Sequence, residues 1–108
     1  MPSEAAGGAQ TTTIGTEHTL ATLTTAGTYQ LAADLSPMQV GDVVELRIKV
    51  KVRAASQSQQ VFYASYADLQ GQDVVALSPP VPAPFEFVAT LKQVAGTSRS
   101  FEWSIYQY

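Results

Sequence analysis

Apolar and charged residues alternate one by one along the middle of the chain. From Val44 to Arg53, aliphatic side chains occupy the even positions and charged side chains the odd positions. Because successive side chains of an extended strand point to opposite faces, this stretch predicts a half-buried antiparallel strand. The pair Gly41-Asp42, typical of turns, stands immediately before it.

The same period of two recurs through most of the remaining sequence. It predicts further strands over residues 17–24, 29–34, 59–69, 73–78, 85–94 and 99–108. Short glycine-containing segments separate them. The only predicted helical turn covers residues 34–40, with Ser36 as its cap and Pro37 in its first position.

The segment 88–103 has Gly96 near its centre and predicts a β-hairpin. In that hairpin, Phe87 and Leu91 are expected to lie near Trp103 and Phe101.

Short strands separated by regularly spaced turns are typical of an all-β fold. We therefore expect an antiparallel β-sandwich of about seven or eight strands, with a jelly roll as one candidate arrangement. Residues 14–108 are predicted to form this single domain. Residues 1–13 are small, polar and without periodicity, so we expect an extended N-terminal arm that is mobile in isolation and ordered by a neighbouring subunit in an assembly.

Composition narrows the possible functions. Charged residues make up 14% of the 108 residues, against about 25% in typical soluble domains. Hydrophobic residues make up 45%, and the remaining surface must be largely Thr, Ser, Gln and Ala, as in proteins that cover their outside with other subunits. The net charge of −3 argues against direct nucleic-acid binding. No segment approaches the ~20 apolar residues of a membrane span, and no basic start of a signal peptide is present.

The sequence offers no chemistry of catalysis. Cysteine is absent and His18 is the sole histidine, which excludes thiolate chemistry and a cluster of imidazole ligands. Serines occur outside any nucleophile elbow, and the acidic residues are scattered. We expect no enzyme, no catalytic residue, no cofactor and no metal site.

Three features are candidates for contact with a partner. The first is a basic ladder on one strand face, Arg47, Lys49, Lys51 and Arg53. It suits an acidic protein surface or nucleic acid, or is a solvated face whose like charges deter pairing between strand edges. We favour the protein surface or the solvated face over nucleic acid, because no aromatic-rich basic groove accompanies the ladder.

The second feature is the proline-rich run 78–84, which predicts a stiff extended connection. Such a connection presents Val81 and Pro82 to a partner, serves as a rigid crossover between sheets, or does both.

The third feature is a surplus of strand aromatics. Phe62, Tyr66, Tyr106 and Tyr108 have no assured place in one core, which favours a subunit interface over burial beneath a second sheet. Ile14, at the start of the patterned region, completes the set of candidate interface residues.

Several strings resemble small structural proteins of tailed bacteriophages. They cover nearly everything after residue 13, and include IGTEHTL at 14–20, GTYQL at 27–31, DLS at 34–36, GDVVELRI at 41–48 and VATLKQVAGTSRSFEWSI at 88–105. The most specific part is the Ala-Gly-Thr-x-Arg-x-Phe-x-Trp pattern at 95–103.

The resemblance implies a virion component assembled in the bacterial cytoplasm. A capsid cement, or decoration, protein suits the size best. Such proteins typically have β-sandwich cores and bind the outer shell of major capsid protein as dimers or trimers. Two alternatives stay open: a head–tail connector, tail or fibre-associated component, and a carbohydrate- or receptor-binding sandwich module.

Overall fold

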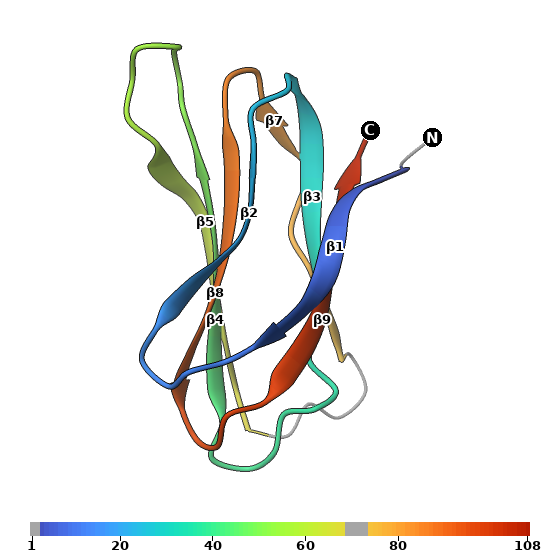
Figure 1. Cartoon of the computed structure of the whole chain (residues 1–108), viewed down its shortest axis with the longest axis vertical. Coiled ribbons are helices and arrows are strands. Elements are labelled where there is room, and N and C mark those ends of the chain that lie inside the picture. Colours follow the sequence, from blue (N-terminus) through green and yellow to red (C-terminus); the bar gives the residue numbers. More distant parts are fainter. Residues whose placement is uncertain (1–2, 69–73) are drawn as a thin grey trace.

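The computed structural model describes residues 3–68 and 74–108 of the chain. Strands are the regular structure in this part of the chain (Figure 1). In chain order they are β1 (Ser3–Thr11), β2 (Glu17–Leu23), β3 (Gly27–Asp34), β4 (Val43–Val50), β5 (Gln59–Ala67), β6 (Val75–Leu77), β7 (Val81–Ala83), β8 (Phe87–Ala95) and β9 (Ser100–Gln107).

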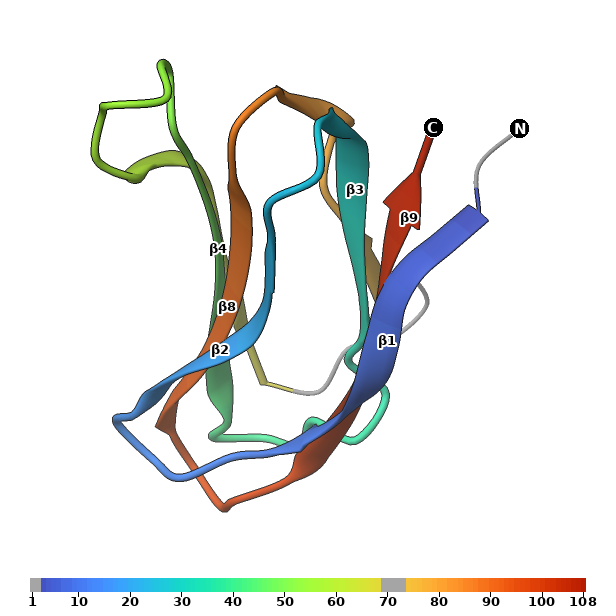
Figure 2. The ribbon, with the colours of Figure 1, turned by 45° about the horizontal axis from the view of Figure 1, so that its top comes forward.

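The strands form two antiparallel sheets that pack face to face. Sheet A has the order β1-β9-β3-β6, with β7 also paired to β3, and sheet B has the order β2-β8-β4-β5. Figure 2 shows the two layers with the crossing loops at either end. The predicted all-β antiparallel sandwich is confirmed.

The path of the chain identifies the arrangement as a jelly roll. Most successive strands lie in opposite sheets. The exception among the described residues that joins hydrogen-bonded neighbours is the connection from β4 to β5, within sheet B. Strands β6 and β7 pair with the two halves of β3, so they act as one interrupted strand. Counted in this way, eight strands fill two four-stranded sheets, as a jelly roll requires.

The core lies between the sheets, where the alternating pattern of each strand places its apolar side chains. From β4, Val44, Leu46 and Ile48 point inward, and from β8, Phe87 and Leu91 meet them. The ring of Phe87 packs against Tyr29 of β3, with 5.2 Å between the ring centroids. Sheet B therefore contacts sheet A through aliphatic and aromatic side chains that are almost fully buried.

The N-terminal segment forms a strand of the sandwich, where the sequence predicts an extended arm outside the domain. Strand β1 pairs antiparallel with β9 from Ser3 to Thr11. Gly8 lies opposite Trp103, and the indole ring of Trp103 runs beneath it, 3.7 Å from the position of a Cβ atom at Gly8. The domain boundary expected near residue 14 thus falls in the crossover between β1 and β2. Strand β1 forms although its own sequence has no strand pattern, because its backbone groups pair with those of β9.

The predicted hairpin between residues 88 and 103 is wrong. Strand β8 lies in sheet B and β9 in sheet A, so the connection at Gly96 crosses from one sheet to the other. Phe87, Leu91 and Phe101 do share the core, but across the two layers and not as paired strand neighbours. A glycine with positive φ suits a hairpin turn and a crossover between sheets alike. The alternation of apolar and polar residues along β8 and β9 is also the same for both connections.

The segment after β3 forms turns and no helix. The amide of Met38 donates to the carbonyl of Leu35 over 3.0 Å, and the Asp34 side chain accepts from the Ser36 amide. Met38 then enters the core, with its side chain fully buried. The outer ends of two predicted strands, residues 69 and 73, lie outside the described residues.

The proline-rich run contributes β7, an edge strand, and a gap before it. At the gap, the Ser78 hydroxyl accepts a hydrogen bond from the Leu31 amide at 3.0 Å, and the Ser78 amide donates to the Leu31 carbonyl. One serine therefore keeps β3 hydrogen-bonded where the edge strand is interrupted.

Candidate interaction surfaces

The outer face of sheet B carries the basic ladder among acidic partners. Arg47 forms an ion pair with Glu45 at 2.8 Å, and its guanidinium lies 4.9 Å from the centre of the Tyr63 ring. The Tyr63 hydroxyl donates to Glu45 at 2.7 Å. This hydrogen bond, followed by the Arg47 guanidinium, holds the pKa of Glu45 below its ordinary value. The same hydrogen bond raises the pKa of Tyr63.

Lys49, the next member of the ladder, pairs with Glu17 of β2 at 3.3 Å. The Thr90 hydroxyl donates to the same carboxylate at 2.6 Å. The hydrogen bond from Thr90, followed by the contacts with Lys49, lowers the pKa of Glu17, although partial burial acts to raise it. Two of the four ladder cations are therefore neutralised within the face. Since β4 is a central strand, the ladder does not protect a sheet edge.

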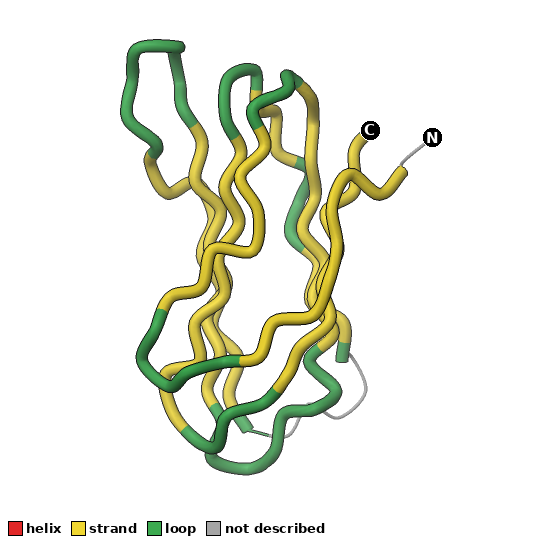
Figure 3. The backbone as a smooth tube through the Cα atoms, in the orientation of Figure 1, coloured by secondary structure: helices red, strands yellow, loops and turns green. Residues whose placement is uncertain are grey.

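Lys51 and Arg53 lie beyond the end of β4, in the connection to β5. This connection stands apart from the rest of the sandwich (Figure 3), and Val52 between the two cations is 74% exposed. Among the described residues, neither cation has an ion-pair partner. The expected four-residue ladder is thus two different features: a paired part on the sheet and an unpaired part on a projecting loop.

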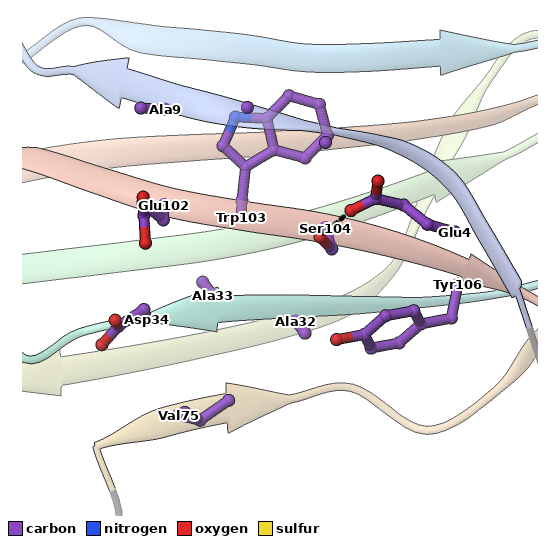
Figure 4. A pocket seen from close by; sticks show the side chains of 12 residues that line it. Glu4, Ala9, Ala32, Ala33, Asp34, Val75, Glu102, Trp103, Ser104 and Tyr106 are labelled. Atoms are coloured by element: carbon purple, nitrogen blue, oxygen red, sulfur yellow. Dashed lines mark hydrogen bonds between the residues drawn. The ribbon is translucent and has the colours of Figure 1, made fainter.

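The outer face of sheet A is hollowed and differs in charge. Its floor consists of small residues, among them Gly7, Ala9 and Ala32, which leave an open depression of about 640 Å³ (Figure 4). The charged residues that line it are all acidic: Glu4, Asp34 and Glu102. The Ser104 hydroxyl donates to Glu4 within the depression.

Apolar side chains border this depression. Val75 and Leu77 of β6 are 52% and 57% exposed, and Tyr106 of β9 lines the depression. Tyr106 thus faces outward, as the strand pattern predicts. Tyr108 follows β9 with 54% exposure, and its hydroxyl donates to the Gln30 side chain.

Several predicted contact residues occupy other places. Phe62 and Tyr66 pack against the core and are half-buried, which leaves each ring only partly open to a partner. Val81 is 6% exposed and belongs to the core, which corrects its placement on a partner surface. Pro82 beside it is exposed, and Ile14 is 40% exposed in the turn between β1 and β2.

The end of the sandwich that holds the β8–β9 crossover contains a buried carboxylate. Asp42 is 1% exposed and accepts hydrogen bonds from the amides of Gln39 and Thr97 and from the Arg99 guanidinium, at 2.9, 3.1 and 2.8 Å. Burial acts to raise the pKa of Asp42, but the Gln39, Arg99 and Thr97 donors outweigh it and the pKa is lowered. The carboxylate joins the β3–β4 loop to the β8–β9 loop.

Buried polar groups extend this connection to the N-terminal crossover. Gln93 is fully buried, accepts from the Thr12 hydroxyl, and donates to the carbonyl of Thr97 at 2.7 Å. The amide of Thr12 donates to the Arg99 carbonyl at 2.8 Å. Three loops are therefore held together by side chains that have fixed partners.

These contacts account for the most specific motif in the sequence. In the pattern at 95–103, Gly96 has φ of +99° and lies against Asp42, while Thr97 and Arg99 donate to that carboxylate. Phe101 enters the core, and Trp103 fills the space beneath β1. The motif that carries the resemblance thus builds a crossover.

His18 has a local structural contact. Its Nε2 atom accepts a hydrogen bond from the Thr13 amide at 3.0 Å, which closes the turn between β1 and β2. Within residues 3–68 and 74–108, no group of three or more His, Asp or Glu side chains is arranged to hold a metal ion. The same residues include no helix long and apolar enough to cross a membrane.

No family model matches the chain, and no curated protein or solved structure is significantly similar to it. The surfaces described above therefore carry the functional argument.

Proposed function

We propose that this chain is a structural protein of a bacteriophage virion, a capsid cement protein that binds across joints between major capsid subunits. The observation that carries the proposal is the number of large apolar side chains that stay exposed although the core between the sheets is filled. Ten large hydrophobic side chains are at least 39% exposed in the described structure. Two of them, Val75 and Leu77, lie on the same short strand beside the depression of sheet A, and exposed apolar residues that lie together mark interaction sites.

The outer face of sheet A is the surface best suited to the capsid. Its small-residue floor lets a partner's side chains approach the backbone closely, and Val75 and Leu77 supply apolar area beside it. Val75 is adjacent to the acidic rim, which favours a basic or neutral partner surface. The resemblance to phage structural proteins and the jelly-roll topology agree with this role, although jelly rolls also occur in lectins.

The proposed mechanism is additive. Each bound copy adds buried area across a joint, so internal DNA pressure has to break more contacts before the shell opens. Modest contacts suffice, because many symmetric copies act together on one shell.

Binding to bare heads tests the proposal. Purified chain is expected to sediment with undecorated phage heads, and Leu77→Lys is expected to weaken that binding at least tenfold, since it places a charge in the apolar border. Val94→Lys is the matched control: Val94 is 41% exposed on the outer face of sheet B, and its replacement should leave binding unchanged. Failure of the unaltered chain to bind heads overturns the proposal.

The depression also favours a second candidate, a carbohydrate-binding module. Carboxylates and an outward-facing tyrosine beside an open hollow are groups that hydrogen-bond and stack on sugars. Glycan-array binding that Glu102→Gln abolishes, together with no affinity for heads, would favour this module over the cement protein.

A further inference from the structure

The four sheet edges of the sandwich differ in how they are protected. An edge strand exposes unpaired N–H and C=O groups, and natural proteins shield such edges with charges, prolines, bulges or short strands. Strands β6 and β7 are three residues each, and β7 contains Pro82. Strand β1 carries Glu4 and a bulge beside it, and β2 carries Glu17 and a bulge.

Strand β5 lacks most of these protections. It pairs with β4 alone, so its other edge is open in the described structure. Its nine residues, QQVFYASYA, contain no charged residue and no proline. They are rich in the aromatic and β-branched types that favour strands.

The bulge in β5 is confined to one end. The register shifts between Ile48 and Lys49, whereas the six residues from Phe62 to Ala67 pair regularly with Val43 to Ile48. The regular, uncharged stretch from Phe62 to Tyr66 therefore remains available for pairing.

We propose that β5 pairs with β5 of a second copy of this chain, antiparallel about a two-fold axis, so that the two B sheets form one continuous sheet. The edge is self-complementary, because an uncharged strand meets no repulsion from itself and its free backbone groups satisfy those of the other copy. Tyr63 and Val61 are 45% and 54% exposed on this strand, and pairing covers part of each.

The register centred on Ala64 fits the side chains best. In this register, the inner and outer faces of β5 continue as the inner and outer faces of β5 in the second copy. Phe62 then lies opposite Tyr66 of the second copy, so the half-buried inner aromatic side chains of both copies form one row. On the outer face, Tyr63 then lies opposite Ser65 of the second copy, a large side chain beside a small one.

This inference is independent of the proposed capsid role, because it concerns the isolated chain. Sedimentation equilibrium of the full chain is expected to show a concentration-dependent dimer. Ser65→Lys places like charges close together across the axis, and is expected to abolish the dimer. Thr22→Lys, an equivalent change on the β2 edge, is the control and should preserve it. Mixing Ser65→Lys with Ser65→Glu should restore a dimer, which shows that both variants are folded.

A disulfide tests the register directly, since the natural chain has no cysteine. Across the proposed axis the two Ala64 Cβ atoms lie about 4.5–5.5 Å apart, close to the separation that a disulfide spans. Ala64→Cys should therefore oxidise to a covalent dimer, and Thr22→Cys should not. A monomeric natural chain, a dimer that survives Ser65→Lys, or equal cross-linking of the two cysteine variants overturns the proposal.

Discussion

The crossover end of the sandwich and the outer face of sheet B use charged residues in opposite ways. At the crossover end, Asp42 is buried, and its donors come from two loops: Gln39 from the β3–β4 loop, and Thr97 and Arg99 from the β8–β9 loop. On sheet B, the Glu17–Lys49 pair keeps a third of each side chain exposed. Breaking a buried pair leaves an uncompensated charge, whereas water replaces a lost surface partner. The buried contacts of Asp42 therefore stabilise the fold, whereas the exposed ion pair on sheet B contributes little to stability.

The largest expected effect follows from removing the buried carboxylate. Asp42→Ala should lower the free energy of unfolding by about 3–5 kcal/mol, because it strands the Arg99 guanidinium and two amides. Urea unfolding measures the loss. Glu102→Ala, on the exposed face of sheet A, is the control and should change stability by no more than about 0.5 kcal/mol. Equal losses in the two variants would remove the distinction between the regions.

Two glycines at the crossover end of the sandwich distinguish steric crowding from backbone strain. Gly96 and Gly41 have φ of +99° and +95°, but a Cβ atom at Gly96 would lie 2.7 Å from the Asp42 Cα, whereas at Gly41 nothing lies within 4 Å. Gly96→Ala should cost about 2–4 kcal/mol and Gly41→Ala about 1–2 kcal/mol. Thermal unfolding of both variants tests this order, and the reverse order would contradict the close contact with Asp42.

Acid should destabilise the protein partly through Asp42. The folded-state pKa of this carboxyl is lowered, so its contribution is present above the unfolded pKa and is lost as the pH falls through the folded value. Unfolding free energy should therefore decline as the pH drops below about 4. Asp42→Asn should be less stable at neutral pH but show a shallower decline. A decline of unchanged slope in this variant would assign the acid sensitivity to other groups.

The smallest effect is expected on sheet B. Glu45→Gln removes the ion pair with Arg47 but keeps a hydrogen-bond acceptor for Tyr63, and should cost no more than about 1 kcal/mol. A double-mutant cycle with Arg47→Met measures the coupling between the two side chains, which salt should reduce further. A coupling as large as the loss in Asp42→Ala would show that this face, too, holds the fold.

The sequence was most informative where one strand's own pattern sets its environment. The alternation from Val44 onward predicts β4 and its inner face, and the turn at Gly41-Asp42 marks its start. It was least informative where a partner decides the outcome. Strand β1 has no pattern of its own, and its place in the sandwich depends on its pairing with β9.

The crossover at Gly96 shows the same limit. Asp42 and Arg99 are 57 positions apart, and no local signal connects them. The same alternation of residues suits two strands in one sheet or in two, so the choice between hairpin and crossover depends on that distant carboxylate. The depression on sheet A arises from small residues on β1 and β3, which become neighbours of β9 only through the topology.

The count of this chain in purified phage particles tests the proposed function most directly. Quantitative mass spectrometry of intact virions should find the chain in a fixed, high ratio to the major capsid protein, because a cement protein occupies joints over the whole shell. A few copies per particle would instead indicate a connector or tail component. Complete absence of the chain from the particles would contradict a structural role in the virion.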